Sequence, residues 1–262
     1  MRFDLECNLK SKVAVVTGAA GDIGRAICQR LSDNGARIAA LDINLLAAEK
    51  LMMSIDSLEA FHVDISDSAS VKKSLEMVIQ RFEGIDILIN NAGVNSLDHR
   101  VSIDNFSIKE WNRIINIDLD GMFLMSKASS RHILKQGSGR IINISSVLGL
   151  AAMRLQSPFT AAKAGMIHLT RSMALELGPK GILTNSIAPG SVLGEGTKKL
   201  FYGDDGHFKE HTKQFLSHVP LARPGTPLEI AEVVLFLASA HSSFINGQIL
   251  AVDGGWTSGF MH

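Results

Sequence analysis

Residues 13–24 read VAVVTGAAGDIG, an apolar run that passes directly into a turn with three glycines. A short run of β-branched and apolar residues is typical of a strand that is buried on both faces. Glycines after such a strand allow a sharp turn and let backbone N–H groups approach a pyrophosphate at the start of the next helix. The stretch therefore predicts the first strand, turn and helix of a dinucleotide-binding sheet, with an ordinary strand-to-helix turn as the alternative.

Outward from this stretch, further apolar runs alternate with helical patterns. The predicted strands are Val13–Val16, Ile38–Leu41, Ala60–Val63, Ile85–Ile89, Arg140–Ile144, Leu183–Ile187 and Ile249–Val252. The predicted helices cover residues 23–34, 44–54, 68–82, 107–135, 157–178 and 227–239. Parallel strands need a crossover helix between them, so this order predicts a Rossmann-type α/β fold, a doubly wound parallel sheet in three α/β/α layers.

Nothing in the sequence divides the chain into parts. Its 262 residues suit one α/β domain, and no linker or repeat interrupts them. We therefore expect residues 1–262 to form a single domain. The stretch 194–219 is a long irregular insertion, and it predicts a substrate lid at about residues 191–218.

Composition and charge exclude several classes of protein. Lysine plus arginine and aspartate plus glutamate both number 26, so no net positive charge favours binding to nucleic acid or to a membrane surface. No run approaches the roughly 18 apolar residues of a membrane span. Two cysteines, and nine histidines without metal-ligand spacing, predict neither a disulfide framework nor a metal site. Together these features predict a cytoplasmic protein that acts on a small molecule.

A carboxylate follows the second predicted strand. Asp42 stands eighteen positions after Gly24, between Leu41 and Ile43, where it can accept hydrogen bonds from both hydroxyls of an adenosine ribose. Its charge repels a 2′-phosphate, and no lysine or arginine follows it closely, so NAD is favoured over NADP. A solvated turn residue is the alternative for Asp42 taken alone.

Several motifs in a fixed order extend this pattern over nearly the whole chain. They are Thr17-Gly18 with Gly24, Asp64, Asn90-Asn91-Ala92-Gly93, Ser146, Lys163, Pro189-Gly190 and Asp253-Gly254-Gly255. In these motifs the chain resembles the short-chain dehydrogenase/reductase family, in an NAD-preferring form. The resemblance implies that the cofactor contacts Gly18, Asp22, Ile23, Gly24, Asp42, Ile43, Asp64, Ile65, Asn91, Ala92, Gly93, Lys163, Pro189, Gly190 and Val192. In that family, the positions of Asp64 and Ile65 approach the adenine, and residues 189–192 lie along the nicotinamide.

The family moves the hydroxyl proton with a tyrosine and a lysine four residues apart on one helix face. The lysine lowers the pKa of the phenol, and a serine thirteen residues before the tyrosine binds the reacting oxygen. The resemblance assigns these roles to Ser146 and Lys163, but the tyrosine position is Phe159. Phenylalanine keeps the ring and lacks the acid–base oxygen, so we expect this chain to be inactive or nearly so.

Two explanations of Phe159 stay open. It is either a substitution introduced to trap substrate in an otherwise active dehydrogenase, or a natural feature of a binding protein that kept the fold. Tyr202, the only tyrosine of the chain, lies in the predicted lid, where an apolar covering role is the simpler interpretation.

Two further positions depart from the residues that the family usually has. Asp22 stands where glycine is usual, and the alternative to a place near the pyrophosphate is capping of a helix that starts at Ile23. Asp118, the fourth candidate catalytic residue, stands where the family commonly has an asparagine that holds a relay water. Its carboxylate can accept hydrogen bonds from water and from Lys163.

Loops after the strands carry the candidate substrate residues, which are Asn95, Ser146, Arg154, Gln156 and Ser191. With the basic residues of the insertion, they favour a small polar substrate such as a sugar, polyol or hydroxy acid. A 3-oxoacyl carrier reductase stays open, although such reductases mostly use NADPH, as does a non-catalytic NAD-binding protein. The resemblance also implies a homotetramer built partly through helix 157–178; packing of that helix's small residues on its own sheet is the alternative.

Overall fold

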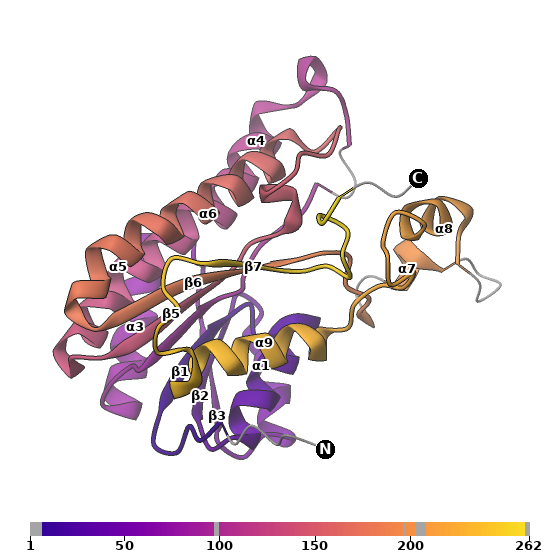
Figure 1. The fold of residues 1–262 in the computed structure, drawn as a ribbon. Coiled ribbons are helices and arrows are strands. Elements are labelled where there is room, and N and C mark those ends of the chain that lie inside the picture. The colour runs from indigo at the N-terminus through magenta and orange to yellow at the C-terminus, as the bar shows by residue number, and fades with distance from the viewer. Residues whose placement is uncertain (1–6, 97–99, 196–197, 203–207, 260–262) are drawn as a thin grey trace, which may run out of the picture.

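A parallel sheet of seven strands forms the centre of the fold (Figure 1). The computed structural model describes residues 7–96, 100–195, 198–202 and 208–259. The strands are β1 Val13–Thr17, β2 Arg37–Asp42, β3 Leu58–His62, β4 Ile87–Asn90, β5 Gly139–Ile144, β6 Ile182–Pro189 and β7 Ile249–Val252. They lie in the order β3-β2-β1-β4-β5-β6-β7, which confirms the predicted doubly wound, Rossmann-type fold.

Helices cover both faces of this sheet (Figure 1). They are α1 Asp22–Asp33, α2 Leu45–Glu49, α3 Ser68–Phe82, α4 Ile108–Ile114, α5 Gly121–Ile133, α6 Ser157–Leu177, α7 Lys198–Phe201, α8 Glu210–Leu216 and α9 Pro227–Ala238. Helices α1 and α9 pack on one face, against Ala14 and Val16, while α3 and α5 pack on the other, against Val13 and Val15. Because alternate residues of β1 face opposite helix layers, the strand has to be apolar throughout.

The prediction of a single regular helix at residues 107–135 is wrong. The segment consists of α4, a π-helical segment Ile115–Asp120, α5 and a 3-10 turn Leu134–Gln136. Within the π-helical segment the Asp118 side chain points inward, and its Oδ1 accepts a hydrogen bond from the Val94 N–H at 2.8 Å. Apolar periodicity does not reveal such a segment, because one wider turn hardly changes the spacing of the buried residues around it.

Two other predicted segments also differ from the structure. The helix predicted at 44–54 divides into α2 and a 3-10 helix at Lys50–Met53. The insertion predicted to be irregular contains α7 and α8, and Tyr202 stacks on Phe208 with ring centroids 4.6 Å apart. Parts of the predicted lid, residues 196–197 and 203–207, lie outside the described residues, so its role as a lid stays a prediction.

Within the described part of the chain, no helix combines the length and the apolarity that crossing a bilayer requires.

Burial in the α1 layer gives a test of the packing. Leu31 on α1 is fully buried against the sheet, so we expect Leu31→Ala to lower the free energy of unfolding by about 2–5 kcal/mol. Urea unfolding followed by circular dichroism measures this change. Leu46→Ala is the matched control, because Leu46 is 73% exposed and its truncation should change stability by only about 0.5 kcal/mol. Equal losses in the two variants would contradict the packing of α1 on the sheet.

Candidate functional site

Two adjoining cavities lie at the carboxyl ends of the strands. The first has a volume of about 630 Å³ and the second about 640 Å³. Both are lined by Ile23, Asn91, Gly93, Val94 and Val192, so they form one continuous cleft. Ligands of doubly wound folds bind at this edge of the sheet, where the strand order reverses between β1 and β4.

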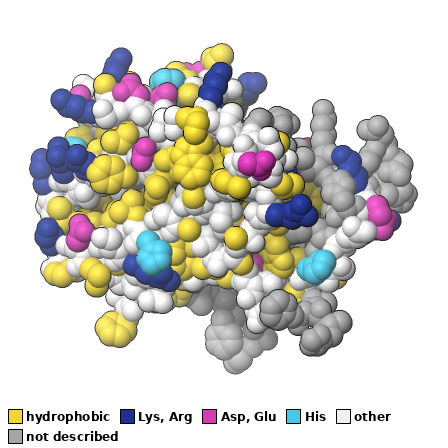
Figure 2. Space-filling model, turned by 90° about the horizontal axis from the view of Figure 1, so that it is seen from above, with side chains coloured by type: hydrophobic (Ala, Val, Ile, Leu, Met, Phe, Trp, Pro, Cys, Tyr) yellow, Lys and Arg dark blue, Asp and Glu magenta, His cyan; other side chains and the backbone are white. Residues whose placement is uncertain are grey.

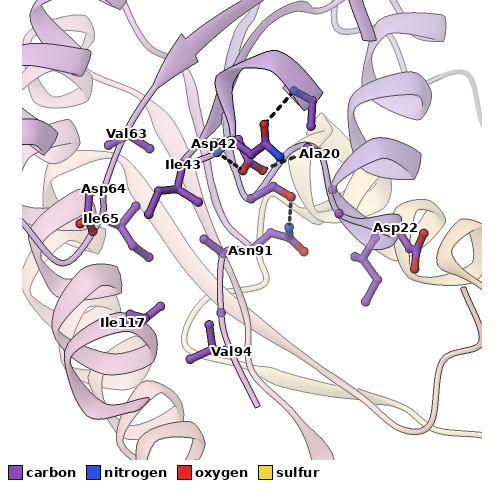
Figure 3. Close-up of a pocket in the computed structure, with 18 of the residues that line it drawn as sticks. Ala20, Asp22, Asp42, Ile43, Val63, Asp64, Ile65, Asn91, Val94 and Ile117 are labelled. Carbon is purple, nitrogen blue, oxygen red and sulfur yellow. Dashed lines mark hydrogen bonds between the residues drawn. The ribbon is translucent and has the colours of Figure 1, made fainter. Parts of the chain in front are cut away.

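The turn between β1 and α1 presses against the loop that follows β4. Gly18 has a φ of +62°, and a Cβ added to it would lie 2.8 Å from the Ala92 Cα. A Cβ on Gly24 would overlap the carbonyl oxygen of Gly18. The Asn91 side-chain amide donates hydrogen bonds to the carbonyl oxygens of Thr17 and Gly18, both at 3.0 Å; Figure 3 draws the bond to Gly18. Glycine is thus needed at both positions, and the bare backbone can approach a phosphate group closely.

Asp42 stands at the end of β2 and ties the turn to the sheet. Its Oδ2 accepts a hydrogen bond from the Ala20 N–H at 2.9 Å, and its Oδ1 accepts one from the Asn44 N–H, also at 2.9 Å (Figure 3). A carboxylate has about four acceptor positions, so two are left for a ligand in the first cavity. Ile43, the next residue, is 66% exposed at the wall of this cavity.

The side of the first cavity nearest β3 is largely apolar. Val63, Ile65 and Ile117 lie there, together with Asp64, whose Oδ1 accepts a hydrogen bond from the Ser66 N–H at 2.9 Å (Figure 3). Apolar side chains on a cavity wall with one polar neighbour suit a flat heterocycle such as adenine.

Asp22 is the first residue of α1 and lies at the wall of the first cavity. The N-cap residue is Gly21, and no side chain caps this helix end, so the alternative of a capping Asp22 with a helix that starts at Ile23 is wrong. A Cβ on Gly194 would overlap the Asp22 carboxylate. The carboxylate is therefore directed toward the loop that follows β6.

Lys163 and Phe159 project from one face of α6 and line the second cavity. Their spacing of four residues places the two side chains side by side on the helix. Lys163 is 5% exposed, and its Nζ lies 5.4 Å from the centre of the Phe159 ring and 3.4 Å from the Ile144 carbonyl oxygen. The ring packs on the buried cluster that contains Leu148 and offers no polar atom to a ligand.

Asp118 lies behind Lys163, and its side chain has no exposed surface. Its Oδ2 is 3.1 Å from the Lys163 Nζ, while Oδ1 is held by the Val94 N–H. A Cβ added to Gly93 would lie 3.2 Å from that Nζ and 3.3 Å from that Oδ2. The ion pair is therefore directly beneath the Gly93 backbone, where the two cavities meet.

Ser146 follows β5 and begins a 3-10 turn at Val147–Gly149. Its Oγ accepts a hydrogen bond from the Leu148 N–H at 3.1 Å. A hydroxyl that accepts in this way can still donate its own proton, so Ser146 can bind an oxygen atom in the second cavity.

Most of the candidate substrate residues lie together. The wall of the second cavity includes Asn95, Ser146, Gln156 and Ser191, with Pro189 and Gly190 beside them. Arg154 is exposed and lies outside the described lining of both cavities. The left-handed backbone of Leu155, with a φ of +65°, separates it from the buried Gln156.

Some residues of the second cavity were not singled out from the sequence. They are Arg100, Phe201, Thr212 and Trp256. These residues come from separate segments, so no local spacing connects them. Only Trp256 had a signal nearby, the Asp253-Gly254-Gly255 motif that it follows.

The two cysteines do not form a disulfide with each other. Cys7 and Cys28 are free and buried, and burial raises the pKa of the Cys28 thiol, so this cysteine is an unreactive packing residue. Among the residues that the structure describes, no three His, Cys, Asp or Glu side chains are grouped so that they could hold a metal ion.

Comparison with known proteins gives matches over nearly the whole chain. A family model described as enoyl-(acyl carrier protein) reductase matches residues 18–257. A 3-oxoacyl-[acyl-carrier-protein] reductase FabG of Thermotoga maritima is 34% identical over 94% of this chain and 98% of its own length. A D-threitol dehydrogenase of Mycolicibacterium smegmatis is 36% identical over 98% and 97%. The solved structure of a levodione reductase superposes with a TM-score of 0.89 at 30% identity, covering 97% of this chain and all of that one.

The glycine turn can be tested with a matched pair of variants. We expect Gly18→Ala to lower the free energy of unfolding by about 1–3 kcal/mol or more, because the left-handed φ and the contact with Ala92 both oppose a Cβ. In Gly21→Ala the added Cβ would meet only the Gly18 carbonyl oxygen at 3.4 Å, so this control should lose less stability, at most about 1 kcal/mol, because alanine is a poorer N-cap than glycine. Chemical denaturation measures both. A Gly18→Ala variant as stable as its control would show that the turn does not have this geometry.

Proposed function

Because the chain belongs to the short-chain dehydrogenase/reductase family, we propose that it is an NAD-dependent oxidoreductase for a secondary alcohol and its ketone, in a form disabled by Phe159. One observation carries this proposal. A single cleft has the glycine turn and Asp42 at one end and Ser146 with Lys163 at the other. The first end suits a dinucleotide, and the second suits the carbon and oxygen that react.

Charge in the first cavity favours NAD over NADP. The described residues that line it include the carboxylates Asp22, Asp42 and Asp64, and neither a lysine nor an arginine. A ribose with two hydroxyls can donate to the free acceptor positions of Asp42, whereas a 2′-phosphate would be repelled by the negative charge of this carboxylate. The residues present therefore fit NAD.

The second cavity supplies groups for most of the reaction. Bound NAD would supply the hydride chemistry. Ser146 can donate a hydrogen bond to the reacting oxygen, and Lys163 beneath Gly93 is placed to hold the cofactor. Phe159 occupies the position from which a proton would be transferred and has no atom that can transfer it. The chain is thus expected to bind both ligands and to react very slowly.

A small polar molecule is the substrate class that we favour, and its members include sugars, polyols and hydroxy acids. The amides of Asn95 and Gln156 and the hydroxyl of Ser191 are polar groups of the cavity wall, and a D-threitol dehydrogenase is among the relatives. A 3-oxoacyl carrier substrate is the second candidate, because relatives named as 3-oxoacyl-carrier reductases match at similar identity. A non-catalytic NAD-binding protein is the third, and it rests on Phe159 alone.

We also propose a cytoplasmic homotetramer. Seen from the side of α4 and α6, hydrophobic side chains gather across the surface, which suits contact with another copy of the chain (Figure 2). Phe123 on α5 and Leu175 on α6 are 44% and 80% exposed. The small residues of α6 are less decisive, because Gly165 faces Leu119 of the same chain and would meet it at 3.0 Å if it had a Cβ.

Cofactor choice can be measured by calorimetry with NAD and NADP. We expect the unsubstituted chain to bind NAD more tightly, and Asp42→Ala to weaken NAD binding by about 10- to 100-fold, since hydrogen bonds to a charged group are lost. The ratio of the two affinities is the readout, because general damage to the turn affects both cofactors alike. Equal affinities of the unsubstituted chain for NAD and NADP would contradict the assignment.

Position 159 can be tested by restoring the missing oxygen. We expect Phe159→Tyr to raise NADH-dependent ketone reduction by about 10²-fold, the lower end of the contribution of general acid–base catalysis, because the phenol supplies a proton while Asp118 pairs with the lysine that would lower its pKa. NADH absorbance measures the rate with ketones of polyols, with keto acids and with a 3-oxoacyl thioester.

Phe201→Tyr is the matched control, since it adds the same hydroxyl to the wall of the same cavity in another segment. Activity should rise in the first variant and not in the control. NADH binding without turnover of any ketone class by Phe159→Tyr would favour the non-catalytic protein instead.

A further inference from the structure

The proposed function uses Lys163 to hold the cofactor but gives no role to its ion pair with Asp118. We propose that Asp118 is the permanent counterion of Lys163, and that this internal pair takes up the charge that would otherwise act on a phenol at position 159. Asp118 is then a positioning residue: it acts through Lys163, and it provides the counter-charge of that lysine in a chain that has no phenol at position 159. The inference deepens the proposed function, since it concerns the same site, but the charge pairing itself does not depend on which ligand binds.

The two charged groups of the pair are close together and buried. The Nζ and Oδ2 atoms are 3.1 Å apart, and the two side chains are 6% and 0% exposed. The second carboxylate oxygen accepts a hydrogen bond from the Val94 N–H at 2.8 Å, which favours the orientation in which Oδ2 faces the lysine. At such burial a pair of opposite charges interacts strongly and is little screened by salt.

Among the described residues, the other charged groups near the pair are Arg113, which is paired with Glu110, and Arg100, whose side chain is exposed to solvent. Arg113, in the last turn of α4, donates two hydrogen bonds to Glu110, both at 2.7 Å. Those bonds are the main reason why the pKa of Arg113 is raised, and Asp118 adds only a smaller contribution. Arg100 lies on the wall of the second cavity with its side chain exposed. Lys163 is therefore the near partner of Asp118.

Asp118 and Phe159 both differ from the residues that the family usually has, and the charge gained at position 118 compensates for the phenol that is absent at position 159. A buried ammonium without a counterion is strongly destabilising. A phenol at position 159 would offer Lys163 an oxygen that accepts a hydrogen bond and becomes an anion on ionisation, whereas Phe159 offers neither. The Phe159 ring offers only its face, 5.4 Å from the Nζ. Asparagine, which the family commonly has at this place, would carry no charge. The carboxylate of Asp118 supplies the anion, and its negative charge opposes the field that Lys163 exerts on its surroundings.

Restoring the phenol then gives a direct measurement of that field. In the Phe159→Tyr variant we expect the phenol to titrate at or above its ordinary pKa of about 10, since Lys163 is neutralised and burial disfavours the phenolate. Adding Asp118→Asn removes the negative charge that lies 3.1 Å from the Lys163 Nζ and should lower the phenol pKa by about one to two pH units. The amide keeps the shape of the side chain, and its oxygen can still accept from the Val94 N–H.

Phenolate absorbance measures this pKa without cofactor, substrate or turnover. Tyr202 is the only tyrosine of the chain, so subtracting the titration of the unsubstituted protein isolates the new phenol. Asp120→Asn is the matched control, because Asp120 lies on the same π-helical segment with an exposed side chain and should leave the phenol pKa unchanged. Circular dichroism at each pH restricts the measurement to folded protein, and a phenol still un-ionised where the protein unfolds at high pH agrees with the proposal.

Two results would overturn the proposal. One is a phenol in the Phe159→Tyr variant that already ionises below about pH 9, because Lys163 would then act on it despite Asp118. The other is a phenol pKa of the Phe159→Tyr variant that changes no more on adding Asp118→Asn than on adding Asp120→Asn. The first result decides the matter even if the Asp118→Asn variant does not fold. A chain that fails to bind NAD would refute the proposed function but would leave this titration readable.

Discussion

The close approach of two loops is the constraint on which the rest of the structure depends. The turn after β1 and the loop after β4 meet so closely that Gly18 has no room for a Cβ against Ala92, and Asn91 bonds the two backbones together. β1 and β4 are neighbours at the point where the strand order reverses. Helices diverge to opposite faces there, so a cleft opens above the contact with bare backbone at its floor.

Burial of a positive charge is the second constraint, and it acts where the two cavities meet. Lys163 lies under the Gly93 backbone, where a charge without a counterion would destabilise the fold. In this chain a carboxylate on the π-helical segment balances it. The π-helical segment and the ion pair belong together, because the segment carries Asp118, whose carboxylate contacts both the Val94 N–H and the Lys163 Nζ.

The two ends of the cleft are built differently. The nucleotide end consists of backbone and of residues at strand ends, which the sheet positions accurately. The substrate end is lined by loops and by the insertion with α7 and α8, and these differ most easily between proteins of one fold. Relatives named for a 3-oxoacyl carrier and for D-threitol match this chain over nearly its full length, so the shared scaffold does not set the substrate.

The sequence alone determined the features that depend on neighbours in the chain. All seven strands, α3 at Ser68–Phe82 and the pairing of Phe159 with Lys163 follow from local periodicity, since buried strands and helix faces repeat every few residues. Contacts between distant segments were decided only by the tertiary structure. The π turn at Asp118, the gathering of Arg100 and Trp256 on one wall and the exclusion of Arg154 from it depend on which loops meet in space, and no local pattern encodes such a meeting.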